Sequence, residues 1–133
     1  MDITPYLFLN GRCDAALSFY TSALGAEIIF VHRFKDAPPQ EGGPMGSPEA
    51  IMHASFKIGS STVLASDGDG QKRPLSGFSL SISVKDLAEG HRVFDKLAEG
   101  GNVMLAFGKT FWTEGFGMVT DRFGVPWMVN VAH

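Results

Sequence analysis

The sequence predicts an α+β fold of two tandem βαβββ modules, which form a curved mixed sheet with the helices on its outer face. The chain has 133 residues, of which 44% are hydrophobic, and this is enough for the core of one domain. The order strand, helix, three strands occurs twice, and a shift of 75 residues aligns a strand end, a helix aromatic and a helix stop. The aligned pairs are Leu9 with Val84, Phe19 with Phe94, and Gly25 with Gly100. We expect one domain over residues 1–133, with modules over 1–70 and 75–133.

The first module contains one helical pattern between strand patterns. Apolar residues recur every three or four positions from Arg12 to Leu24, and Gly25 follows where a helix-ending glycine belongs. Alternating residues before and after Gly59-Ser60 predict a hairpin. The predicted strands of this module are Ile3–Leu9, Glu27–Lys35, Ile51–Ile58 and Thr62–Ser66.

Two irregular segments interrupt the pattern. Asp36 to Pro48 contains four prolines and three glycines, so it is a loop, and its length suits a lid over a pocket. Asp67 to Pro74 is polar and glycine-rich, and we expect it to be the linker between the modules.

The second module repeats the order of the first. From Phe78 to Val84, apolar residues alternate strictly with serines, which predicts a strand with one hydroxyl face. Asp86 with Glu89 three positions later predicts a capped helix start, and Gly100-Gly101 ends that helix. Three strands are predicted to follow, over Val103–Phe107, Phe111–Val119 and Trp127–Val131.

Charge and composition exclude several functions. The net charge of −3 and pI near 5.7 have the wrong sign for binding nucleic acid. No apolar run approaches the roughly 20 residues that span a bilayer, and the start has no export leader pattern. Cys13 is the single cysteine, so we expect no internal disulfide and a cytoplasmic location.

Paired βαβββ modules resemble the vicinal oxygen chelate superfamily, which includes glyoxalase I, bleomycin resistance proteins and extradiol dioxygenases. The resemblance covers essentially the whole chain and is closest to the PhnB-like branch. It rests on the segments Pro5-Tyr6-Leu7-Phe8-Leu9-Asn10-Gly11, Ser18-Phe19-Tyr20, Leu24-Gly25-Ala26-Glu27, Ile51-Met52-His53-Ala54, Ala65-Ser66-Asp67, Thr110-Phe111-Trp112 and Asp121-Arg122-Phe123-Gly124-Val125-Pro126-Trp127.

The resemblance implies four metal-ligand positions, on the first and last strands of the modules. They fall on Thr4 or Pro5, near Leu64, on Ser79 and near Met128. None of these side chains offers imidazole, carboxylate or thiolate, so we expect no metal and no other cofactor. Some members of this branch resemble a demethylubiquinone methyltransferase domain, but no G-x-G-x-x-G opens a helix after a strand here.

We expect the ligand-binding side chains to lie in the concavity of the sheet. His53, on the polar face of a strand, can act there as acid, base or hydrogen-bond donor, or else be an edge histidine bonded to a carbonyl. The serine face can bind a polar ligand or be solvated, and Trp112 with Tyr6 or Phe8 can stack on a flat ligand or be core. Cys13 is expected to be a packing thiol. The predicted ligand-binding residues are Tyr6, Phe8, His53, Ser66, Ser79, Ser81, Trp112 and Met128.

The expected function is therefore metal-free binding of a small organic molecule, with catalysis left open. The first alternative is a metal-dependent lyase, isomerase or dioxygenase, whose ligands would come from His53, Glu114 or a partner chain. The second is a protein-interaction module, if side chains fill the concavity. The family resemblance implies a homodimer.

Overall fold

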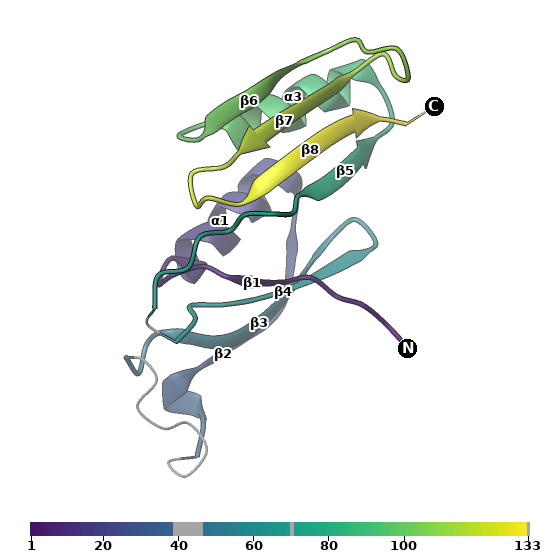
Figure 1. Cartoon of the computed structure of the whole chain (residues 1–133). Coiled ribbons are helices and arrows are strands. Elements are labelled where there is room, and N and C mark those ends of the chain that lie inside the picture. Colours follow the sequence, from purple (N-terminus) through teal and green to yellow (C-terminus); the bar gives the residue numbers. More distant parts are fainter. Residues whose placement is uncertain (39–46, 70, 133) are drawn as a thin grey trace. The chain divides into compact units, whose positions relative to one another are not determined.

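The computed structural model describes residues 1–38, 47–69 and 71–132. The chain forms two compact units, Met1–Arg73 and Pro74–His133. Within the described residues, each unit contains one α-helix and one four-stranded sheet (Figure 1). In the same residues, no helix is long and apolar enough to cross a membrane.

The sheet of the first unit has the strand order β1-β4-β3-β2. Strand β1 runs parallel to β4, and the other neighbours are antiparallel. A 3-10 helix, η1, follows β2 directly. The elements are β1 (Tyr6–Phe8), α1 (Cys13–Leu24), β2 (Glu27–Arg33), η1 (Phe34–Asp36), β3 (Ile51–Ile58) and β4 (Ser61–Ser66).

Helix α1 covers one face of this sheet. Its buried residues include Ala16, Leu17 and Tyr20, and the Tyr20 ring stacks on Phe56 of β3 with centroids 5.8 Å apart. The helix ends as expected at Gly25, which has a φ of 66° and donates its N–H to the carbonyl of Thr21. Because side chains alternate along a strand, the opposite face of the sheet carries the residues between these core positions.

The second unit repeats this topology with the order β5-β8-β7-β6. Strand β5 is parallel to β8, and the other neighbours are antiparallel. Asp86 caps the helix as predicted, since its Oδ1 accepts the N–H of Glu89 at 2.9 Å. The elements are β5 (Leu80–Val84), α3 (Leu87–Ala98), β6 (Asn102–Gly108), β7 (Phe116–Thr120) and β8 (Pro126–Val131). The predicted α+β fold of two βαβββ modules is therefore confirmed.

Four predicted strands are too long. Strand β2 ends at Arg33 rather than Lys35, and β5 begins at Leu80 rather than Phe78. The differences at β1 and β7 are larger. Strand β1 begins at Tyr6 rather than Ile3, because its neighbour β4 pairs with Tyr6 to Phe8 alone. Strand β7 begins at Phe116 rather than Phe111. The preceding residues form a turn in which the N–H of Thr110 donates to the carbonyl of Thr113 at 3.0 Å, and this turn replaces strand pairing.

The segment predicted as a linker, Asp67 to Pro74, starts inside the core of the first unit. Asp67 is buried, and its carboxylate accepts the backbone N–H groups of Cys13 at 2.8 Å and Ile51 at 2.7 Å. The predicted lid, Asp36 to Pro48, lies mostly outside the described residues, because 39–46 are not among them.

Candidate functional site

The candidate site is the open face of the first sheet, the face opposite α1. Register places two rows of side chains across this face. The first row has one residue from each of the four strands. The second row lies two residues away along each strand, on the same face. The first row is Tyr6, Leu64, Ser55 and Phe30; the second contains the pairs Phe8 with Ser66 and His32 with His53.

Five of these side chains form a series of ring contacts across the face. Their centroids are 5.0 Å apart for Phe8 and Tyr6, and 5.5 Å for Tyr6 and His53. Phe30 then contacts His53 at 5.3 Å and His32 at 4.9 Å. Tyr6 is 37% and Phe8 44% exposed, so part of the series is accessible to solvent. We call these five residues the ring series.

A hydrogen bond joins Tyr6 and His53, which are neighbours in the ring series. Tyr6 Oη lies 3.0 Å from His53 Nδ1, and the two rings are nearly parallel at 17°. His53 is half-buried, which agrees with its predicted place on the polar face of its strand. The ring series therefore combines flat apolar area with an imidazole that is held in place.

The fourth predicted residue of the first unit, Ser66, is placed differently. It is 4% exposed, and its Oγ accepts the N–H of Gly68 at 3.2 Å. This bond stabilises the turn after β4. Ser66 thus lies in the second row, but its hydroxyl already has a partner.

The other four predicted residues belong to the second unit. Ser81 is exposed and pairs with Met128 across β5 and β8, so both lie on the face opposite α3. Ser79 precedes β5 and is half-buried. Trp112 lies in the loop before β7 rather than at a strand start, and its ring contacts Phe116 at 5.2 Å. Their part in ligand binding stays a prediction.

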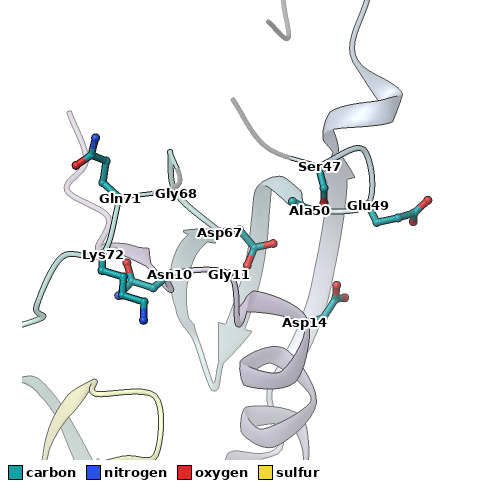
Figure 2. Close-up of a pocket in the computed structure, with 10 residues that line it drawn as sticks. All are labelled: Asn10, Gly11, Asp14, Ser47, Glu49, Ala50, Asp67, Gly68, Gln71 and Lys72. Atoms are coloured by element: carbon teal, nitrogen blue, oxygen red, sulfur yellow. The ribbon is translucent and has the colours of Figure 1, made fainter. Parts of the chain in front are cut away.

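A pocket of about 500 Å³, lined mostly by polar residues, opens beside the N-terminus of α1 (Figure 2). Asp67 lines it, and both of its carboxylate oxygens accept hydrogen bonds from backbone N–H groups. Asp14 lines another side and forms a two-point ion pair with Arg33 at 2.8 and 2.9 Å, which lowers the pKa of Asp14. These two carboxylates therefore tie α1 to β3 and β2.

Cys13 is fully buried beside this pocket. Burial, followed by the charges of Asp67 and Asp14, raises the pKa of its thiol to about 12. A thiol in this state is a poor nucleophile, which agrees with the expected packing role.

The four positions of the superfamily metal site do not fit a divalent cation. Leu64 and Met128 occupy the last strands of the two units, and Thr4 and Ser79 precede their first strands. An alkyl group, a thioether and two hydroxyls form a poor donor set for Zn²⁺, Ni²⁺ or Mn²⁺. Across residues 1–38, 47–69 and 71–132, His, Cys, Asp and Glu form no group of three that could hold a metal.

Sequence reasoning missed Phe30 and His32 as site residues. Both lie in β2 and share the open face with His53, the register partner of His32. Their spacing of two along a predicted strand places them on one face, but only strand pairing shows that this face meets His53.

Comparison with known proteins gives the family. Residues 1–130 match the family model described as 3-demethylubiquinone-9 3-methyltransferase. The chain belongs to this family. It is 41% identical to protein YjdN of Escherichia coli (strain K12), over 98% of this chain and 95% of that protein. The crystal structure of protein PA1353 from Pseudomonas aeruginosa is 42% identical, covers 98% of this chain and 97% of that chain, and has a TM-score of 0.88.

Two further structures bear on the branch and the superfamily. The PhnB protein from Bacillus cereus is 27% identical with a TM-score of 0.83, over 99% of this chain and all of that one, which confirms the PhnB-like resemblance. A glyoxylase/bleomycin resistance protein/dioxygenase domain from Frankia sp. EAN1pec is 15% identical with a TM-score of 0.72, over 100% of this chain and 98% of that one. This second likeness shows the superfamily fold.

Proposed function

We propose that the protein binds a small organic molecule on the open face of its first sheet, and that it does so without a metal ion. The observation that carries this proposal is the ring series, in which five contacting rings lie on one partly exposed face. Binding sites commonly combine exposed apolar area with a few polar groups that fix orientation.

The chemistry of the ring series favours a flat ligand. Stacked aromatic pairs contribute about 0.5–1.5 kcal/mol each beyond the area that they bury. Tyr6 and His53 place polar atoms among the rings, where they can orient the ligand. A planar molecule with at least one polar substituent therefore fits this surface best.

Two arguments support binding without a metal or methyl-donor cofactor. The residues at the four superfamily ligand positions are poor donors for divalent cations. Each sheet contains one parallel strand pair, whereas dinucleotide-type cofactors bind at the strand ends of largely parallel sheets. The methyl transfer named in the family description is therefore not part of our proposal.

The proposal is tested by titrating the full chain, after EDTA treatment, with 2-acetylnaphthalene while the ring resonances of Tyr6 and His53 are followed by NMR. We expect saturable shifts. Phe8→Ala should weaken binding about ten-fold, because a stacking surface is lost. Phe78→Ala is the matched control, since Phe78 is 42% exposed and Phe8 44%.

Two results would contradict this proposal. Titration without saturable shifts would remove the binding site from this face. Binding that EDTA abolishes and Zn²⁺, Ni²⁺ or Mn²⁺ restores would favour the metal-dependent alternative.

We also propose a cytoplasmic homodimer. The lone buried Cys13 suits a reducing compartment. Apolar side chains exposed on the edge strands β2 and β6 support self-association, since exposed apolar edges need a cover. Fractionation of cells that express the protein tests the location.

A further inference from the structure

We propose that Tyr6 holds His53 in the tautomer that carries its proton on Nε2, so that the ring series selects ligands bearing a hydrogen-bond acceptor. This inference rests on the proposed function and names the ligand class of that same site. It makes Tyr6 a positioning residue and His53 the group that contacts the ligand.

The geometry fixes one nitrogen of His53. Nδ1 lies 3.0 Å from Tyr6 Oη, a normal length for a hydrogen bond between nitrogen and oxygen. The imidazole is held between two rings, stacked on Tyr6 at 5.5 Å and tilted against Phe30 at 5.3 Å. A ring packed in this way keeps the same nitrogen directed at Tyr6.

The direction of this bond follows from the chemistry of the two groups. A phenol O–H is a good donor, and its oxygen is a weaker acceptor than the unprotonated nitrogen of an imidazole. Tyr6 therefore donates and His53 Nδ1 accepts. In the neutral ring, the proton must then be on Nε2.

Nε2 is left with an N–H group to offer. Among the residues that the structure describes, no group other than Tyr6 forms a hydrogen bond with the imidazole of His53. His53 is half-buried on the open face, and Nε2 has no protein partner among the described residues. A polar group in that position favours a ligand that completes its bonding.

These features define the ligand class. A carbonyl, carboxylate or phenolate oxygen accepts the Nε2 proton, while the flat part of the ligand rests on the rings. A ligand with only donors leaves the N–H unpaired and binds less tightly. The site should therefore prefer flat acceptor-bearing molecules, such as aryl ketones, over hydrocarbons of the same shape.

The proton position is tested directly by ¹⁵N NMR of the imidazole rings in the full chain, at about pH 8.5 where ordinary histidines are neutral. We expect His53 Nε2 to show a protonated shift and Nδ1 an unprotonated one. In Tyr6→Phe, which keeps the ring contacts, the two shifts should move toward each other as the other tautomer gains population. A wild-type spectrum with the proton on Nδ1 overturns the inference.

Selectivity is tested with 2-acetylnaphthalene and 2-isopropenylnaphthalene, which differ in an oxygen replaced by a methylene. Wild type should bind the ketone about ten-fold more tightly, the factor expected for one hydrogen bond. His53→Phe preserves a ring and should reduce this preference to about two-fold or less. Tyr6→Phe should give an intermediate preference.

The outcomes separate the two proposals. If both probes bind equally to wild type, the proposed function stands and the selectivity fails. If neither probe binds, the proposed function fails and the ligand class with it, while the spectrum still decides where the proton lies. If His53→Phe retains the ketone preference, His53 does not contact the ligand oxygen.

Discussion

At the scale of single residues, a buried carboxylate anchors the backbone in each unit. Asp67 binds the N–H groups at the starts of α1 and β3. Asp121 accepts from the N–H groups of Phe123 and Val125 and from Trp127 Nε1, at 2.8, 3.1 and 2.8 Å. Both lie in segments that carry the family resemblance. Those segments therefore mark structural anchors as well as candidate ligand contacts.

Replacing Asp121 with Asn should destabilise the second unit by about 2–3 kcal/mol. The amide loses the charge that strengthens the three hydrogen bonds, and its NH₂ group faces a donor. Both tryptophans lie in this unit, so tryptophan fluorescence during urea denaturation reports the loss. Asp95→Asn, at an exposed position of α3, is the control and should change stability by less than about 0.5 kcal/mol.

The buried thiol of Cys13 predicts a loss of stability in alkali. Its pKa is raised from 9.0 in the unfolded chain to about 12, so the folded protein holds the proton more tightly. The stabilisation is complete below pH 9 and is lost as the pH rises toward 12. Between pH 8 and 10 the unfolding free energy should fall by about 1 kcal/mol more in wild type than in Cys13→Ala. Equal falls in the two proteins would refute this assignment.

At the scale of elements, sequence patterns located α1 and α3 because their signals are local. Gly25 ends α1, and Asp86 caps α3. The start of β7 was misplaced, because the hydrogen bonds of Thr110 and Thr113 form a turn within a segment rich in strand-forming residues. Propensity did not reveal which of two local hydrogen-bond patterns would form.

The candidate site was only partly predictable for a related reason. Alternation placed His53 on the polar face of its strand, and the structure agrees. The contact between His53 and Tyr6 depends on β4 lying between their strands, which no spacing rule specifies. Phe30 and His32 enter the site through the pairing of β2 with β3. Pairing between strands distant in the sequence therefore determines these contacts, which local patterns do not specify.

Glycines let α3 and β6 approach β7 closely, which predicts the effect of adding a methyl group. A Cβ at Gly117 would lie 2.7 Å from the Phe94 ring and 2.9 Å from the Phe107 backbone, and the backbone cannot easily move. Gly117→Ala should destabilise the second unit by about 1–3 kcal/mol in urea denaturation. Gly108→Ala, in β6 with open space around it, should have a much smaller effect. Comparable losses in the two variants would show that the close approach is not the cause.

At the scale of the whole molecule, one topology supports two different surfaces. Register makes Tyr6 and Leu64 of the first sheet equivalent to Ser81 and Met128 of the second, since each pair joins the parallel strands. At these positions the first open face thus carries a phenol ring and an alkyl group, and the second carries a hydroxyl and a thioether. The repeat preserves the core pattern, while the two open faces differ in the chemistry of their side chains.

The edge strand β6 gives the last prediction, on self-association. It exposes three consecutive apolar residues, Val103, Met104 and Leu105, of which Met104 is 61% exposed. An apolar edge of this kind tends to be covered by another surface. If a second copy supplies that surface, light scattering should give twice the 14.3 kDa chain mass. Met104→Glu should shift the mass toward the monomer, because a carboxylate in the interface would lose its water.

The control for this experiment is Asp95→Lys, which changes charge on the exposed side of α3 and should leave the mass unchanged. A monomer mass for wild type would refute the homodimer. A dimer that Met104→Glu leaves intact would place the interface away from β6, and the exposed pair Ile28 and Ile29 on β2 would then be the next edge to alter. Strand β2 also supplies Phe30 and His32 of the ring series. A charged residue at Ile28 could therefore both dissociate the dimer and weaken binding of 2-acetylnaphthalene. That double effect would link assembly to the ring series.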